Sequence, residues 1–292
     1  MPEGHSVHRL ARRFTDGFAG QALAVSSPQG RFAAGAAALD GAVLEQARAH
    51  GKQLFLDFAG DRVLRSHLGL YGAWSFGGAA GAASIGAPRR TGQREASGDA
   101  APAGPLVVPP PVGAVRVRLV GEEGWADLRG PTLCVLETRA EADAARAGLG
   151  PDPLDPRADP EPFVAAVRRS RRPVGALLMD QGVLAGVGNI FRAESLFRRR
   201  LHPMTPGRAL GEDELRGLWA ENAALMRTGV RLGRIVTTDP VDRPGVAEER
   251  AWPEHAHYVY KRAGQPCRRC GTAVAAGELE ARSLYWCPSC QA

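Results

Sequence analysis

The sequence predicts an α+β protein of more than one domain, and three patterns along the chain support this fold class. An amphipathic helix precedes about a hundred residues with strand-like alternation, a helical stretch follows, and two Cys-x-x-Cys pairs close the chain. At 292 residues the chain is long enough for two or three compact units, each with its own core.

The first helix is predicted over Ser6–Phe18, where apolar residues recur at helical spacing and arginines occupy the other face. It begins directly after Met1-Pro2-Glu3, so removal of Met1 would leave Pro2 with a free secondary amine beside a carboxylate. A terminal amine with a pKa of roughly 7.8 is ~14% neutral at pH 7, against ~0.04% for an ordinary lysine, so Pro2 is a candidate Schiff-base nucleophile. Glu3 is placed to move the proton. Pro-Glu is also an ordinary start to a helix, and the pair alone leaves both interpretations open.

Four strands are predicted from alternating apolar residues: Lys52–Phe58, Arg62–His67, Val115–Leu119 and Thr132–Leu136. Lys52 stands after Gly51 at the start of the first of them, and as a lone lysine it carries no functional signal. Residues 77–112 are dominated by Gly, Ala, Pro and Ser without periodicity, and we expect a flexible excursion from the sheet there.

Leu70 and Tyr71 are expected on a glycine-flanked loop after the second of these strands. Apolar side chains presented in this way can insert into a stack of bases and fill the space that a flipped base leaves. Ordinary core packing is the alternative for both residues.

A joint rich in Pro and Asp, Gly150–Pro156, separates the strands from the helices. Four helices are predicted beyond it: Glu161–Ser170, Val174–Gln181, Ile190–Arg199 and Glu212–Thr228. The second and third are joined by Gly186-Val187-Gly188-Asn189, where Asn189 either caps the following helix or donates to an anion at its N-terminus.

The two terminal pairs, Cys267/Cys270 and Cys287/Cys290, match the spacing of a structural zinc site, in which four thiolates leave no open position for catalysis. One structural zinc ion is therefore expected to organise the last segment. A hairpin between the pairs would present Arg282 at its tip, suited to binding phosphate, although a surface arginine is equally ordinary there.

The chain is basic, with a net charge of +6, and much of the excess is clustered arginine, which favours a polyanionic partner; ordinary solvated arginine is the alternative. No apolar run approaches the ~18 residues of a membrane span, and the N-terminus has no signal-peptide pattern. These patterns favour an intracellular protein without membrane attachment.

Taken together, the motifs resemble the formamidopyrimidine-DNA glycosylase and endonuclease VIII family over nearly the whole chain. The motifs that carry the resemblance are, in order, Pro2-Glu3-Gly4, Gly51-Lys52, Ser66-His67, Gly150-Pro151-Asp152, Leu178-Met179-Asp180-Gln181, Gly186-Val187-Gly188-Asn189, Gly264-Gln265-Pro266-Cys267 and Tyr285-Trp286-Cys287-Pro288-Ser289-Cys290-Gln291. The resemblance implies an N-terminal β-sandwich domain with flanking helices (1–137), a helix-two-turns-helix domain (150–250) and a C-terminal zinc-finger β-hairpin (256–292).

The resemblance also implies roles for the matching residues. Pro2 would attack the deoxyribose and form a Schiff base, Glu3 would transfer protons, and Lys52 would act as an acid. Asn189 and Arg282 would hold the phosphates around a flipped nucleotide, and Arg282 would serve the δ-elimination step. The implied partner is double-stranded DNA with an oxidised base or an abasic site. The implied protein is a monomer in the bacterial cytoplasm, on the nucleoid when bound to DNA.

Leu70-Tyr71-Gly72 and Tyr285-Trp286-Cys287-Pro288 are similar to the endonuclease VIII branch, which favours oxidised pyrimidines as substrates; oxidised purines are the alternative. The chain departs from the family at His5-Ser6, where a second Pro-Glu is common, and His5 is a candidate base in its place. Gly69 stands where the branch carries a polar residue. A non-catalytic protein that binds damaged DNA is the alternative from another functional class.

Overall fold

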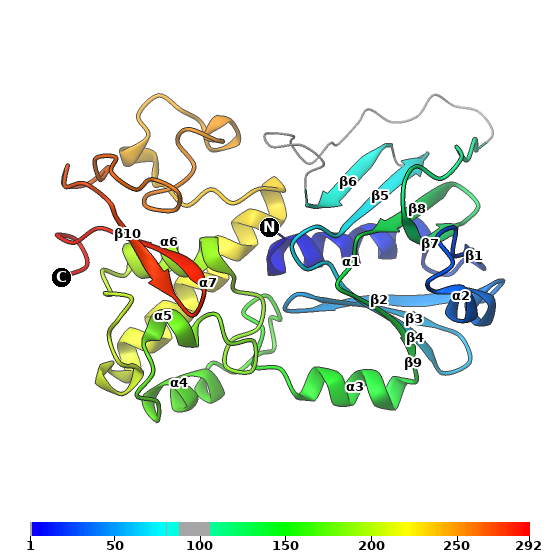
Figure 1. Cartoon of the computed structure of the whole chain (residues 1–292), viewed down its shortest axis with the longest axis horizontal. Helices are drawn as coiled ribbons and strands as arrows, with labels where there is room; N and C mark the ends of the chain where they lie inside the picture. Colours follow the sequence, from blue (N-terminus) through cyan, green and yellow to red (C-terminus); the bar gives the residue numbers. More distant parts are fainter. Residues whose placement is uncertain (1, 80, 88–105) are drawn as a thin grey trace. The chain divides into compact units, whose positions relative to one another are not determined.

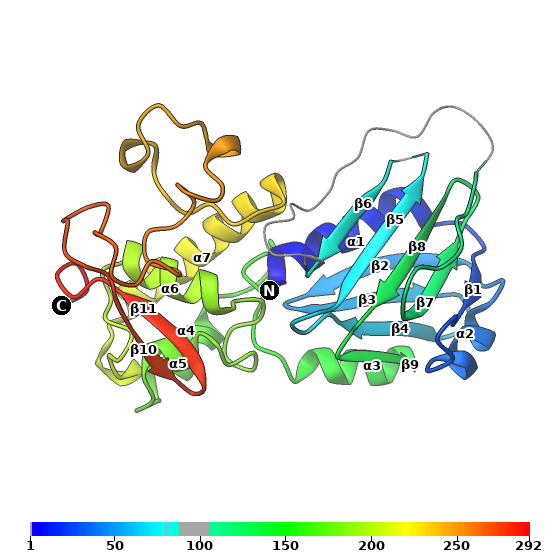
Figure 2. The ribbon, with the colours of Figure 1, turned by 45° about the horizontal axis from the view of Figure 1, so that its top comes forward.

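The computed structural model describes residues 2–79, 81–87 and 106–292 and divides into two compact units, Met1–Ala147 and Gly148–Ala292 (Figures 1 and 2). Among these residues, no helix combines the length and the apolar character that crossing a membrane requires.

The first unit is built mainly from strands. Its described elements are α1 (Gly4–Phe18), β1 (Ala24–Ser26), α2 (Ala33–Leu39), β2 (Leu44–His50), β3 (Gln53–Phe58), β4 (Arg62–His67), β5 (Ala73–Gly78), β6 (Ala83–Gly86), β7 (Val115–Val120), β8 (Gly124–Arg129), β9 (Leu133–Glu137) and α3 (Arg139–Ala147). They form a five-stranded sheet in the order β1-β7-β8-β5-β6 and a four-stranded sheet in the order β2-β3-β4-β9. Every pairing in both sheets is antiparallel.

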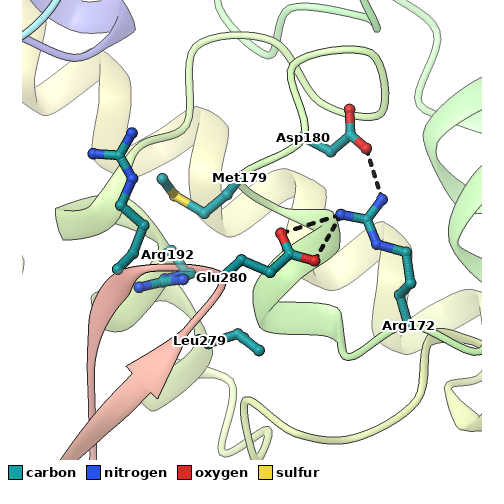
Figure 3. Close-up of a pocket in the computed structure, with 7 residues that line it drawn as sticks. Arg172, Met179, Asp180, Arg192, Leu279 and Glu280 are labelled. Carbon is teal, nitrogen blue, oxygen red and sulfur yellow. Dashed lines mark hydrogen bonds and ion pairs between the residues drawn. The ribbon is translucent and has the colours of Figure 1, made fainter.

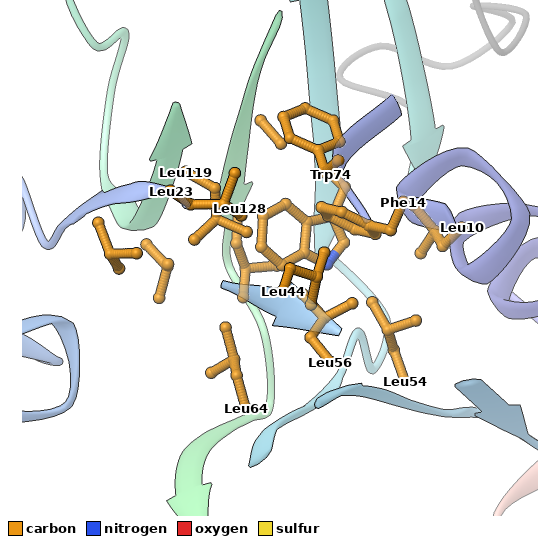
Figure 4. Close-up of a cluster of buried hydrophobic side chains, with 14 of the residues drawn as sticks. Leu10, Phe14, Leu23, Leu44, Leu54, Leu56, Leu64, Trp74, Leu119 and Leu128 are labelled. Atoms are coloured by element: carbon orange, nitrogen blue, oxygen red, sulfur yellow. The ribbon is translucent and has the colours of Figure 1, made fainter. Parts of the chain in front are cut away.

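The two sheets and α1 share one hydrophobic core (Figure 4). Leu10 and Phe14 of α1 are buried in the same cluster as Leu56 of the four-stranded sheet and Trp74 of the five-stranded sheet. The Phe14 ring meets the Trp74 ring edge-on at 4.9 Å, a favoured aromatic geometry. The sequence-based prediction of an N-terminal β-sandwich is therefore confirmed.

Two details differ from the predictions for this unit. β6 lies inside the stretch 77–112 that was expected to be a flexible excursion, and it pairs with β5; residues 88–105 lie outside the described residues. In β3 the alternation predicted one buried face, yet Phe55 and Asp57 are buried as well. Phe55 packs with Ala142 of α3, and Asp57 accepts two hydrogen bonds from Arg48, so both faces of the strand are covered.

The second unit is built from helices followed by a small hairpin. Its elements are α4 (Glu161–Arg168), α5 (Val174–Leu177), α6 (Asn189–Arg198), the 3₁₀ turn η1 (Gly207–Ala209), α7 (Glu212–Leu232), the 3₁₀ turns η2 (Pro240–Asp242) and η3 (Glu248–Arg250), and the strands β10 (Ala275–Leu279) and β11 (Arg282–Trp286). The α+β fold class is confirmed by this arrangement.

Two helices have different lengths from those predicted. α7 runs to Leu232 because Gly233, at φ 72°, supplies the left-handed residue that ends it. α5 is a single turn that ends at Leu177 rather than Gln181. The side chain of Gln181 instead donates to the carbonyls of Met179 and Val187, each at 3.0 Å, and accepts from Gly186 N at 3.0 Å. This amide therefore braces the loop that leads into α6.

A buried carboxylate on α6 joins this helix to two later segments of the unit, at Thr237 and at Tyr258–Tyr260. Glu194 is 0% exposed and accepts hydrogen bonds from the backbone N–H groups of Tyr258 (2.7 Å), Val259 (2.9 Å) and Tyr260 (2.8 Å), and from the hydroxyl of Thr237. Hydrogen bonds to an ionised acceptor are roughly twice as strong as neutral ones. The segment before the first cysteine pair is thereby attached to α6.

We predict that Glu194→Gln destabilises the second unit by about 3 to 5 kcal/mol, because the amide's NH₂ would face N–H donors that it cannot satisfy. Native-state hydrogen exchange of the Tyr258–Tyr260 amides measures the change. Glu161→Gln, at an exposed carboxylate paired with Arg216, is the matched control and should change exchange little. Equal exchange in the two variants would contradict the role given to Glu194.

Candidate functional site

Pro2 and Glu3 are both buried where the chain enters α1. Glu3 is the N-cap residue with φ −118° and ψ −179°, and its side chain makes no capping hydrogen bond. Pro2 precedes the helix instead of occupying its first turn. A helix start does not require either residue to be buried, yet Glu3 is 0% exposed.

His5 is buried beside them in the first turn of α1, with its Nε2 3.2 Å from the hydroxyl oxygen of Ser6. Burial, together with the positive charge of Arg9, lowers the pKa of His5 to about 3. The imidazole is therefore neutral near pH 7. A base is most effective when its pKa lies near the working pH, so the structure does not favour His5 as the replacement base considered above.

Lys52 follows Gly51 in the turn between β2 and β3, where Gly51 has φ 56° and tolerates the left-handed conformation. Lys52 is half-buried. Burial, followed by the positive charges of Lys52 and Arg65, lowers the pKa of His67. His67 Nδ1 in turn accepts a hydrogen bond from Gly69 N at 3.1 Å, so Lys52 and the loop after β4 are linked through one imidazole.

The loop between β4 and β5 presents Leu70 and Tyr71 to solvent, with exposures of 45% and 83%. Core packing is therefore wrong as an explanation for these two residues. The loop turns at Gly69, where φ is 63°, and a Cβ at this position would lie 1.8 Å from Thr132 Oγ1. A side chain at this position would require Thr132 to move and would also strain the backbone.

Asn189 is the first helical residue of α6 and is 7% exposed. Gly188 is the N-cap residue, so the interpretation of Asn189 as a capping residue is wrong. Its Oδ1 accepts a hydrogen bond from the guanidinium of Arg192, one helical turn further on, and the same nitrogen donates to Ser283 O at 2.8 Å. Arg192 therefore connects Asn189 to strand β11.

Arg282 is the first residue of β11 and pairs with Leu279, so the hairpin turn consists of Glu280 and Ala281. Both have positive φ, 49° and 56°, which defines a turn of the type I′ kind that Asn-Gly normally forms. Non-glycine residues in this conformation cost on the order of 1–3 kcal/mol each, and they persist where their surroundings hold them.

Those surroundings form a pocket of about 280 Å³ within the second unit (Figure 3). Its charged lining residues are Arg172, Asp180, Arg192, Glu280 and Arg282, with Met179 and Leu279 as apolar lining. Three guanidinium groups against two carboxylates leave a net positive site. Guanidinium groups recognise phosphate through paired hydrogen bonds, so an anion suits this pocket.

The four cysteines, Cys267, Cys270, Cys287 and Cys290, meet at the base of the hairpin with all Sγ atoms within 4.8 Å of one another. The Cys267–Cys290 and Cys270–Cys287 Sγ distances are 3.9 and 3.5 Å. Thiolates at about 2.3 Å from a tetrahedral zinc ion lie about 3.8 Å apart, so the donor set fits this metal. Arg269 N also lies 3.5 Å from Cys267 Sγ.

Three family models match successive parts of the chain. The formamidopyrimidine-DNA glycosylase N-terminal domain matches residues 1–104, its H2TH domain matches residues 149–240, and the zinc finger found in FPG and IleRS matches residues 264–292. The protein named Endonuclease 8 1 from Mycobacterium tuberculosis is 44% identical over 292 residues, covering 100% of both chains. The chain belongs to the formamidopyrimidine-DNA glycosylase and endonuclease VIII family. It falls on the endonuclease VIII-like branch and is a DNA glycosylase and abasic-site lyase of base excision repair.

Solved structures show the same fold. The MutM (Fpg) protein from Thermus thermophilus superposes with a TM-score of 0.71 at 27% identity, covering 99% of this chain and 98% of that one. The Lactococcus lactis Fpg, solved in complex with DNA containing an abasic site, gives a TM-score of 0.73 at 19% identity and covers 99% of each chain.

The sequence did not single out Arg192 and Glu194, because residue type alone does not show whether a charged residue of a helix is buried or exposed to solvent. Arg172 was visible only as one member of an arginine cluster. His67 was noted within a motif but without a role. All residues of α6 from Asn189 to Phe197 are buried. Apolar residues on several faces of this helix are the signal that could have indicated buried partners for its charged residues.

We predict that a purified chain carries one zinc ion and that Cys287→Ser loses it, because three remaining ligands cannot close the tetrahedron. Metal analysis measures the loss, and limited proteolysis of residues 264–292 should accelerate with it. Cys134→Ser, at a half-buried cysteine in β9, is the control and should retain the metal. Full zinc content in Cys287→Ser would disprove the assignment.

We also predict that acid selectively loosens α1 through His5. The unfolded chain protonates His5 at its ordinary pKa of 6.5 and the folded chain near 3, so the unfolded state binds more protons in this window. Stability is therefore lost as the pH falls, by about 2 kcal/mol from this group between pH 7 and pH 5. Hydrogen exchange of α1 amides at both pH values measures it.

His5→Gln should reduce that pH dependence in α1, whereas His255→Asn, at a half-buried histidine of the second unit, should leave it unchanged. His67 is also expected to contribute in the same direction, because burial lowers its pKa. An unchanged pH dependence in His5→Gln would contradict the buried neutral imidazole.

Proposed function

We propose that the enzyme excises oxidised bases from double-stranded DNA, with pyrimidines favoured, through a Schiff base on Pro2 and β,δ-elimination. The observation that carries the proposal is the buried Pro2–Glu3 pair at the entry to α1, which the requirements of the helix do not explain. Removal of Met1 makes the Pro2 nitrogen a secondary amine, able to form an iminium ion (the Schiff base of a secondary amine) with a sugar carbon.

The proposed reaction begins with attack of the Pro2 nitrogen on C1′ of the damaged nucleotide. The bond from C1′ to the base breaks, and the base leaves with its electron pair and is protonated. The attached nitrogen loses its N–H proton, and its electron pair then expels the ring oxygen to give an iminium ion, with Glu3 transferring the proton that the ring oxygen requires. Loss of a C2′ proton then breaks the C3′–O bond, and a second elimination breaks the C5′–O bond. Water finally releases the sugar fragment from Pro2.

The remaining candidate residues are given supporting roles. Lys52, linked electrostatically to His67, would act as an acid toward the lesion. Leu70 and Tyr71, exposed on their loop, would enter the space that the flipped nucleotide leaves, offsetting part of an unstacking cost of a few kcal/mol. Asn189 and Arg282 would bind the flanking phosphates, with the arginine-rich pocket as the supporting observation.

The preference for pyrimidines is supported by the whole-length similarity to a protein named as an endonuclease 8. The segment from Thr237 to Arg250 provides further support. It forms two short 3₁₀ turns, and Arg243 donates to Thr238 O and Val246 O within it. The sequence of this segment does not resemble the purine-capping loop of the formamidopyrimidine branch, which favours the other substrate class.

Borohydride trapping tests the proposal. Wild-type enzyme with Met1 removed should give a covalent adduct on duplexes that carry one oxidised pyrimidine or one abasic site. Protein that retains Met1 has the Pro2 nitrogen in a peptide bond, so it should lose at least about 90% of the adduct. Asp16→Asn, an exposed change on the same helix, is the control.

Unchanged trapping in protein that retains Met1 would overturn the proposed nucleophile. Duplexes carrying one oxidised purine each separate the alternative substrate class, since faster excision of these would reverse the stated preference. Salt-dependent DNA binding without any adduct would indicate a non-catalytic DNA-binding protein.

A further inference from the structure

The conformation of the turn at the tip of the zinc hairpin is not one that its two residues favour. An ion-pair network from outside the hairpin contacts this turn. Glu280 and Ala281 both adopt positive φ, although neither is glycine or asparagine. A two-residue turn of this kind needs support from outside, because its residues do not favour it. Arg282 follows directly, so the conformation of the turn determines where its side chain begins.

The support comes from Arg172, at the entry to α5 (Figure 3). Its Nη2 donates to both carboxylate oxygens of Glu280, at 3.1 and 3.3 Å, and its Nη1 donates to Asp180 Oδ2 at 2.8 Å. The other oxygen of Asp180 accepts from Gly182 N at 3.1 Å, which fixes this carboxylate to the loop before α6. Arg172 thus joins the hairpin tip to a rigid loop.

Leu279 provides a second contact on the other side of the turn. A Cβ at Gly175 would lie 3.2 Å from Leu279 Cδ2, so the leucine packs directly on α5. Arg192 holds Ser283 O on the far side of Arg282. Leu279 and Ser283 are therefore both anchored, and the segment between them, Glu280–Arg282, depends on the contact of Glu280.

We propose that Arg172, Asp180 and Glu280 form a positioning latch that holds the Glu280–Ala281 turn, and with it Arg282, in the geometry that binds the phosphate of the damaged nucleotide. The inference rests on the proposed function of Arg282 and extends it to three residues that do not touch the reacting atoms. The side chains of Arg172 and Glu280 are 44% and 52% exposed. Exposed pairs contribute little to folding stability, so the latch is expected to bias the orientation of the turn that the β10–β11 pairing already closes, with little effect on the stability of the unit.

Glu280→Gln tests the latch by removing the carboxylate charge while keeping the shape of the side chain. Strand scission of an abasic-site duplex under single-turnover conditions should slow on the order of tenfold, because misplacing a binding group lowers the rate more than affinity. Thermal stability and zinc content should remain at the wild-type level. Arg172→Met should slow scission similarly, and the double variant should show no further loss.

Glu278→Gln is the matched control. Glu278 is an exposed residue of β10 in the same hairpin, and its substitution changes the net charge equally. It should leave scission unchanged. A rescue variant, Glu280→Asn combined with Ala281→Gly, removes the latch but supplies residues that favour this turn unaided, so it should recover most of the lost rate.

Equal rates for Glu280→Gln and Glu278→Gln would overturn the latch, as would a rescue variant that stays slow while folded and zinc-loaded. A loss of rate that follows a loss of zinc or of thermal stability would also overturn it, since the network would then be structural. Hydrogen exchange at Arg282 and Ser283 should rise in Glu280→Gln and Arg172→Met but not in Glu278→Gln, and this measurement does not depend on catalysis. If wild-type enzyme gives no borohydride adduct, the proposed function fails, and the exchange measurement still decides the latch.

Discussion

The carboxylate of Glu194 on α6 accepts hydrogen bonds from four groups that lie 43 to 66 residues further along the chain. A buried charge without partners would be costly. The folded unit therefore requires α6 to pack against both the Thr237 segment and the Tyr258–Tyr260 segment. The same helix carries Asn189 at its first position and Arg192 one turn later. α6 therefore organises both the phosphate-binding candidates and the base of the zinc hairpin.

The two units hold their candidate groups by different physical means. In the first, the amine-bearing end of the chain is fixed by hydrophobic packing, since α1 inserts Leu10 and Phe14 into the core shared by two sheets. In the second, short loops contribute few residues to the hydrophobic core. They are fixed by buried and half-buried ion pairs, by the hydrogen bonds of the Gln181 side chain and by the four cysteines. The nucleophile candidate is thus positioned by packing, and the phosphate-binding candidates are positioned by polar networks.

Local sequence patterns were sufficient to predict the fold class, several helices and strands, and the metal site. Helical periodicity predicted α1 from Ser6 where it begins at Gly4, alternation predicted Arg62–His67 as a strand, and cysteine spacing predicted the metal site. β2 was missed because Leu44–His50 has mostly polar and small residues, and its place depends on pairing with β3. The Glu280–Ala281 turn could not be foreseen, because its residues oppose the conformation that Arg172 stabilises. The roles of Arg192 and Glu194 depend on partners distant in sequence.

Gly69 and Thr132 constrain how this enzyme can change over time. The hydroxyl of Thr132 occupies the space that any side chain at position 69 would need, and the glycine's left-handed backbone adds a second barrier. A polar residue can replace Gly69, beside Leu70, only if Thr132 is also replaced by a smaller residue and the loop adopts another backbone conformation. Divergence at this tip is therefore expected to proceed through paired replacements, and grafting a longer residue there by design requires redesigning the start of β9 as well.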